Sequence, residues 1–286
     1  MQRRNRGGSI IRTILLMLVA LAIGFGAALI AYPHLSFPKI GTPATVAERT
    51  TVSENELDMA LGTYSYEGKT TSVSVREAIE EATSLEAAKN ADGSYNVPSV
   101  DNVLAIARNR LLVSDAQARG LSVTKEETAA YAQETMGTTD YAAIAASYGM
   151  NAQQAEELMG RSALIKKLRD SVVSTKAPAA PQAPAAPGDG VEDESRPEYG
   201  AYIVALLGDE WNGAANTWAR EDGPYRAVLS SYTISNDGAT YSAAKAAYEV
   251  ALAQHAAAQK QISAEWTAYV NTILSKVSVQ LSSLVA

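Results

Sequence analysis

The stretch Val103-Leu-Ala-Ile-Ala-Arg-Asn-Arg-Leu-Leu-Val-Ser-Asp-Ala-Gln-Ala-Arg-Gly-Leu-Ser-Val-Thr-Lys-Glu-Glu127 decides the fold. Its apolar residues recur at helical spacing, which predicts a helix that buries one face. Gly120 is the expected end of this helix, because glycine readily adopts the positive φ found there. Thr124 and Glu127 have the spacing of a capping box, in which each side chain satisfies a backbone N–H at the start of a helix. Two helices joined by a short turn are therefore expected.

Similar signals lie on both sides of this stretch. Residues 64–75 alternate loosely around Glu67-Gly68, which predicts a small hairpin or an extended edge. Ser74 and Glu77 form a second capping-box pattern. Asn151 is expected to cap a long helix, and glycines mark the ends of the shorter ones before it. Residues 74–173 are thus predicted to form a helical unit with short connections.

A proline-rich segment follows the helical unit. Residues 176–187 read Lys-Ala-Pro-Ala-Ala-Pro-Gln-Ala-Pro-Ala-Ala-Pro, and an acidic run follows. This composition predicts a stiff, extended, solvated linker. Residues 198–234 are interpreted as one or two helices broken at Asp222-Gly-Pro224, and a long alanine-rich helix is predicted from about 240 to 275. The tail 277–281 alternates like a strand.

The N-terminus carries a membrane signal. Residues 14–32 are nineteen mostly apolar residues without a charge, about 28 Å long as a helix, and arginines precede them. We expect a transmembrane anchor with a cytoplasmic N-terminus. The alternative is a cleaved signal peptide, whose apolar region would be shorter. Small residues four apart leave open a weak homodimer through this segment. They are Ala20, Gly24 and Ala28.

Composition excludes several kinds of chemistry. The chain has no cysteine, which rules out disulfides and thiolate ligands. His34 and His255 are its only histidines, so a histidine triad or multi-histidine metal site is not expected. Beyond the basic tail, 31 acidic residues face 20 basic ones, which argues against nucleic acid binding. No phosphate-loop or dinucleotide pattern is present. We predict no catalytic residues, no cofactor and no metal.

The motif around Gly120 resembles the N-terminal chaperone domain of the SurA and PrsA foldases, which is related to trigger factor. The family pattern runs from paired leucines through an alanine and a glycine to a valine-threonine-x-glutamate-glutamate helix start. The matching residues are Leu111, Leu112, Ala116, Gly120, Val123, Thr124, Glu126 and Glu127. Residues 266–279 resemble the family's closing helix and strand. The resemblance covers about residues 52–175 and 262–281.

The resemblance implies a mainly α fold with a discontinuous bundle, short strands and a helical insert. Together with the membrane signal and the proline-rich segment, it divides the chain into a basic tail (1–12), an anchor (13–32), a tether (33–50), a chaperone lobe (51–175), an acidic Pro/Ala-rich linker (176–198), a Trp/Tyr-rich helical insert (199–258) and a C-terminal helix and strand completing the lobe (259–286). Many family members carry a parvulin isomerase domain in the insert. Residues 198–250 are too short for one and lack its motifs, so isomerase activity is not expected.

The function implied is a membrane-anchored, extracytoplasmic holdase that binds unfolded or newly secreted polypeptides. Aromatic and methionine side chains suit an adaptable binding surface. The client-binding candidates are Tyr131, Met136, Tyr141, Tyr148, Met150, Met159 and Trp266. For each of them, an ordinary core or surface role is the competing interpretation. For the whole protein, the alternative is a non-catalytic envelope scaffold that docks one fixed partner.

Overall fold

The computed structural model describes residues 49–99 and 101–282. The basic tail, the predicted anchor 13–32 with its small-residue stripe Ala20, Gly24 and Ala28, and nearly all of the tether lie outside this range. No helix in the described part of the chain combines the length and the apolar character needed to cross a membrane.

The described residues are mainly helical, with three small sheets. The elements are β1 (Thr51–Val52), η1 (Glu54–Glu56), β2 (Ala60–Tyr66), β3 (Lys69–Ser74), α3 (Val75–Glu80), α4 (Leu85–Ala88), β4 (Tyr95–Asn96), α5 (Asp101–Ala118), α6 (Lys125–Met136), α7 (Tyr141–Tyr148), α8 (Ala152–Val172), α9 (Pro197–Leu207), η2 (Gly208–Glu210), β5 (Trp211–Asn212), β6 (Thr217–Trp218), α10 (Pro224–Leu229), α11 (Tyr241–Leu274) and β7 (Ser278–Leu281).

The chain divides into two compact units. Among the described residues, unit 1 comprises 49–174 and 265–282, and unit 2 comprises 175–264. Unit 1 is therefore built from two stretches that are far apart in the sequence. Helix α11 contributes its last turns to unit 1 and its first turns to unit 2.

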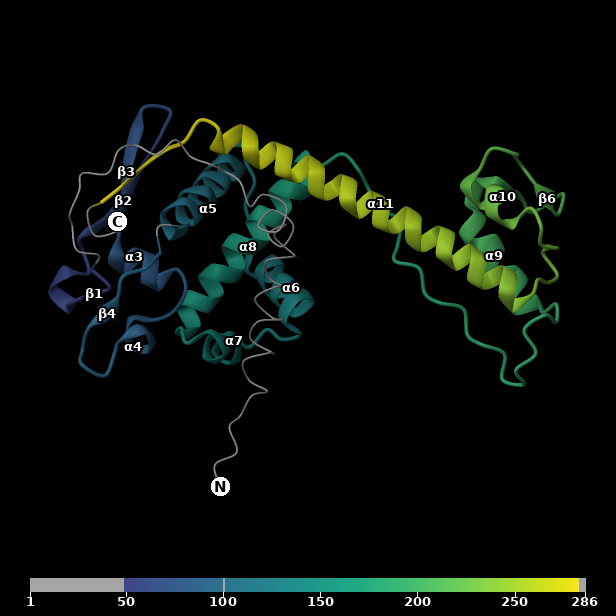
Figure 1. Cartoon of the computed structure of the whole chain (residues 1–286), viewed down its shortest axis with the longest axis horizontal. Coiled ribbons are helices and arrows are strands. Elements are labelled where there is room, and N and C mark those ends of the chain that lie inside the picture. The colour runs from purple at the N-terminus through teal and green to yellow at the C-terminus, as the bar shows by residue number, and fades with distance from the viewer. Residues whose placement is uncertain (1–48, 100, 283–286) are drawn as a thin grey trace, which may run out of the picture. The chain divides into compact units, whose positions relative to one another are not determined.

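A three-stranded antiparallel sheet joins the two stretches of unit 1. The predicted hairpin is confirmed, with β2 and β3 turning at Glu67-Gly68, where both residues have positive φ. The predicted C-terminal strand is confirmed as β7, which pairs with the other edge of β2 from Gly62↔Leu281 to Ser65↔Ser278 (Figure 1). Because β7 covers this edge, β2 is the central strand and has no free edge.

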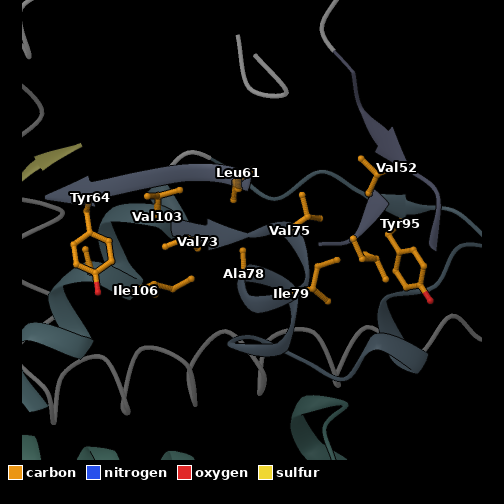
Figure 2. Close-up of a cluster of buried hydrophobic side chains, with 12 residues drawn as sticks. Val52, Leu61, Tyr64, Val73, Val75, Ala78, Ile79, Tyr95, Val103 and Ile106 are labelled. Atoms are coloured by element: carbon orange, nitrogen blue, oxygen red, sulfur yellow. The ribbon is translucent and has the colours of Figure 1, made fainter. Parts of the chain in front are cut away.

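An apolar core lies on one face of this sheet. Side chains of β2, β3, α3 and α5 gather there, and Leu61, Val73, Val75 and Val103 have no measurable exposure (Figure 2). At Gly62 a Cβ atom would lie 2.9 Å from the Gln280 carbonyl oxygen and 3.2 Å from Val103, so only glycine allows this close packing. The hairpin, α3 and α5 thus share one core.

Capping residues set the helix boundaries in the rest of unit 1, as predicted. The capping boxes of Ser74–Glu77, Thr124–Glu127 and Asn151–Gln154 are all formed. Gly120, Gly137 and Gly149 have positive φ at the ends of α5, α6 and α7. A second core cluster lies among α6, α7 and α8. These local signals explain why the chain turns where it does.

Unit 2 differs from its predicted structure. Residues 198–234 are not simply one or two helices, because the β5–β6 pair separates α9 from α10. Trp211 and Trp218 are cross-strand partners with ring centroids 5.7 Å apart in an edge-on arrangement. Such aromatic pairs stabilise two-residue strands that carry no periodic sequence signal. The long helix α11 was predicted correctly.

The proline-rich segment lies on unit 2 and is not a fully solvated linker. Residues 173–187 form no helix or strand. The Tyr202 hydroxyl donates to the Gln182 carbonyl oxygen at 2.6 Å, and the Tyr199 hydroxyl donates to the Ala185 carbonyl oxygen at 3.0 Å. The segment is thus extended and most of its residues are exposed, but Pro181, Pro184 and Pro187 are half-buried and two of its carbonyls are bound by unit 2.

Candidate functional site

An apolar groove lies between α5 and α8 in unit 1. Its volume is about 350 Å³, and its apolar walls are Val113 of α5, Val123 of the α5–α6 turn and Leu164 of α8. Leu164 is only 6% exposed and lines the groove, which is shallow and open to solvent. The volume is at the lower end of the range of about 300–1,000 Å³ found for ligand sites. The groove therefore has room for a few apolar side chains.

Gly160 leaves the groove hollow. It lies one helical turn before Leu164 in α8 and lines the groove without a side chain. A Cβ atom at this position would meet only Thr128, at 3.7 Å, which is an ordinary contact. Glycine inside a helix costs about 0.5–1 kcal/mol relative to alanine, so packing does not account for its presence here.

Polar contacts hold the rim of the groove in place. The Lys167 ammonium donates to the Ser122 carbonyl oxygen at 2.9 Å and to the Glu127 carboxylate at 2.7 Å. These bonds hold the turn that carries Val123 against α8. On the other side, Arg161 pairs with Glu81 at 2.8 Å. Among the residues that line the groove, Arg161 is thus ion-paired and Glu157 accepts a hydrogen bond from Gln153, so the groove offers mainly its apolar walls.

A three-residue cluster connects α11 to α5, and we call Asp115, Arg119 and Tyr269 the C-terminal clasp. The Tyr269 hydroxyl donates to Asp115 Oδ2, and Arg119 Nε lies 2.9 Å from the same oxygen. The Arg119 guanidinium lies 5.4 Å from the centroid of the Tyr269 ring. The clasp thus fastens the C-terminal stretch of unit 1 to the helix that forms one wall of the groove.

Burial and the Asp115 carboxylate raise the pKa of Tyr269 to about 12. Both favour the neutral phenol, because tyrosinate would be desolvated and would face a like charge. A folded-state pKa above the ordinary value of about 10 means that the clasp contributes fully to stability below pH 10. This contribution is lost as the pH rises from about 10 to about 12.

We expect the Tyr269 ring to titrate near pH 12 in the folded protein. The measurement is the ¹³Cζ NMR shift of labelled tyrosine, assigned by the signal that disappears in Tyr269→Phe. In Asp115→Asn the pKa should move down, because an uncharged amide no longer disfavours tyrosinate. A Tyr269 titration near pH 10 in the unaltered protein would contradict this account of the clasp.

The predicted client-binding residues have different surroundings. Tyr131 and Met159 are buried in the cluster among α6, α7 and α8, at 5% and 1% exposure. Four others are half-buried and pack against this cluster. They are Met136, Tyr141, Tyr148 and Met150. The structure therefore brings six of the seven together, but Tyr131 and Met159 offer core packing and almost no surface.

Trp266 lies apart from these six, in α11. It is 4% exposed and stacks on Tyr269 at a centroid distance of 5.6 Å with an interplanar angle of 19°. Nearby, Glu265 accepts a hydrogen bond from the Ser174 backbone N–H at 2.8 Å. Trp266 thus helps to pack the C-terminal stretch and is not a surface aromatic.

Sequence reasoning did not identify the residues that form the groove as a site. Val113 and Gln117 are one turn apart on α5, and Glu157, Gly160, Arg161 and Leu164 share one face of α8. The available signal was Gly160, a glycine in the interior of a long predicted helix.

Metal binding receives no support from the described side chains. Residues 49–99 and 101–282 contain no group of three or more histidine, aspartate or glutamate side chains placed to hold a metal ion.

Comparison of the chain with family models, with curated protein sequences and with solved structures gives no match.

Proposed function

We propose that this protein is an extracytoplasmic chaperone that is anchored in the membrane through residues 13–32 and binds unfolded or newly secreted polypeptides. Unit 1 would be a SurA/PrsA-like discontinuous bundle without a parvulin domain, completed by α11 and β7. The observation that carries the proposal is the groove of Val113, Val123 and Leu164, in which the lining residue Arg161 is paired with Glu81 and the lining residue Glu157 accepts a hydrogen bond from Gln153. Such a groove suits apolar side chains of any client and selects no particular sequence.

The strength of such binding would be modest. Burial of apolar client surface contributes roughly 25 cal/mol per Å². Ordering of the client and of side chains in the groove offsets much of this gain. Weak, exchangeable binding is what a holdase needs, and anchoring would raise the local concentration near emerging clients without new contacts.

Filling the groove is expected to abolish client protection. In Gly160→Leu, the new side chain starts beside Thr128 and takes up space in the groove that Gly160 lines. The control is Gly160→Ala, whose Cβ makes only ordinary contacts and which should stabilise α8 by about 0.5–1 kcal/mol. The measurement is light scattering by a chemically denatured client, with the full chain in lipid nanodiscs at several-fold molar excess.

The outcomes separate the two functional classes. The proposal expects the unaltered chain and Gly160→Ala to suppress scattering, and Gly160→Leu to lose suppression while Trp266 fluorescence shows a folded unit 1. Absence of suppression by the unaltered chain would overturn the chaperone proposal. Recovery of one stoichiometric membrane partner in a pulldown, in place of many secreted clients, would favour the envelope scaffold.

A further inference from the structure

The prolines of the segment on unit 2 follow a strict period of three. They are Pro178, Pro181, Pro184 and Pro187. A polyproline II helix has three residues per turn, so this spacing places all four prolines on one edge. In the structure Pro181, Pro184 and Pro187 are half-buried, whereas the residues between them are exposed. The segment therefore packs on unit 2 through Pro181, Pro184 and Pro187, whereas Pro178 is exposed.

The hydrogen bonds to this segment have the same period. The two accepting carbonyls belong to Gln182 and Ala185, which are three residues apart, and the two donors, Tyr199 and Tyr202, are three residues apart on α9. Two hydroxyls from one face of α9 thus bind two carbonyls of the extended segment, and both pairs have the same three-residue spacing. Polyproline II backbone has no internal hydrogen bonds, so its carbonyls are free to accept from a partner.

Three aromatic side chains, Tyr199, Tyr202 and Tyr241, form the surface on which the segment packs, and we call them the tyrosine platform. Tyr199 is 5% exposed, and its ring lies 5.5 Å from that of Tyr241 with an interplanar angle of 50°. Burial raises the pKa of both Tyr199 and Tyr202, so both hydroxyls remain donors throughout the neutral range. Grooves lined by aromatic side chains are a recurring means of recognising proline-rich chains.

Residues 178–187 do not fill all the space above the tyrosine platform. A hollow of about 240 Å³ remains between the segment and the platform, and Pro184, Pro187, Tyr199 and Tyr202 are among the residues that line it. A further bond at 2.9 Å joins His255 Nδ1 to the Pro178 carbonyl oxygen. The segment is therefore seated through a few bonds and ring contacts, and an equivalent chain could replace it.

We propose that Tyr199 and Tyr202 form a polyproline II-binding site which the chain's own residues 178–187 occupy, and which binds a proline-rich polypeptide of the same three-residue spacing when this segment is released. The tethered segment acts as an intramolecular competitor. Its high effective concentration lowers the apparent affinity of any ligand that arrives from solution. This proposal does not depend on the chaperone function of unit 1.

The test uses a fluorescent peptide with the sequence of residues 177–188 and the full chain in detergent micelles, with binding read by anisotropy. The release variant carries Pro181→Ala, Pro184→Ala and Pro187→Ala, which removes the rings that seat the segment. We expect it to bind the peptide at least tenfold more tightly than the unaltered chain. Adding Tyr199→Phe and Tyr202→Phe should weaken binding about two- to tenfold per hydroxyl.

Two controls make the result specific. A peptide of the same composition with its prolines grouped together should bind the release variant at least tenfold more weakly than the spaced peptide. With Trp266 replaced by phenylalanine, tryptophan fluorescence reports whether unit 2 remains folded in every variant, since Trp211 is 8% exposed and its strand partner Trp218 lies in the same unit. The proposal is overturned if the folded release variant does not bind the spaced peptide, if it binds both peptides equally, or if the two phenylalanines have no effect.

Discussion

Replacing Met159 by alanine is expected to destabilise unit 1 by about 2–5 kcal/mol, the range for loss of a large buried side chain. Met159 is 1% exposed and packs in the cluster that contains Tyr131, Ile144 and Ala155. These neighbours come from α6, α7 and α8, so the cavity would lie where three helices meet. The cost includes both the lost burial and the unfilled space.

The measurement is urea unfolding of the full chain in detergent micelles, followed through Trp266, with the other two tryptophans replaced by phenylalanine. Met150→Ala is the matched control, because Met150 is half-buried and its removal opens no enclosed cavity. We expect a clearly smaller loss for this variant. Equal losses for the two variants, or a loss below about 1 kcal/mol for Met159→Ala, would show that Met159 is not a core residue.

Replacing Gly223 by alanine is expected to destabilise unit 2 by about 1.5–3 kcal/mol, the value of hydrogen bonds to a charged group. Glu210 is 3% exposed, and its carboxylate accepts from the backbone N–H of Arg226 at 2.9 Å and of Tyr225 at 3.4 Å. A Cβ atom at position 223 would lie 1.9 Å from Glu210 Oε2. Alanine would therefore expel the carboxylate from the start of α10.

Backbone strain does not explain this effect, because Gly223 has φ −80° and ψ 151°, which alanine adopts freely. A double-mutant cycle provides the control. In a Glu210→Ala background the clashing side chain is absent, so Gly223→Ala should lower the free energy of unfolding by less than about 1 kcal/mol. This remaining cost reflects the preference for glycine over alanine at the N-cap of α10. Urea unfolding followed through Trp211 measures all four forms. Additive costs of the two changes would refute the predicted coupling.

Local signals in the sequence predicted much of unit 1. The hairpin at Glu67-Gly68, the capping boxes and the glycine helix ends are all present as expected. Each depends on residues within one turn, so the printed sequence contains all the information required. The pairs β1–β4 and β5–β6 were missed, because strands of two residues have no detectable period.

The candidate sites were harder to predict than the helices. Tyr131, Met159 and Trp266 were chosen for their chemistry, but burial decides whether such side chains are core or surface. The groove depends on which faces of α5 and α8 meet, and helical spacing alone does not specify this. The proline period was visible in the sequence, yet its partners Tyr199 and Tyr202 lie on a separate helix.

The sequence by itself determined where most helices of unit 1 begin and end, where the chain turns between them, and that residues 176–187 are extended, because these properties follow from local backbone preferences and capping. Only the tertiary structure decided that β7 pairs with β2, that Gly160 opens a groove and that Tyr199 and Tyr202 hold the prolines. Those features join residues distant in sequence, and their energies come from packing and hydrogen bonds that exist only once the chain has folded.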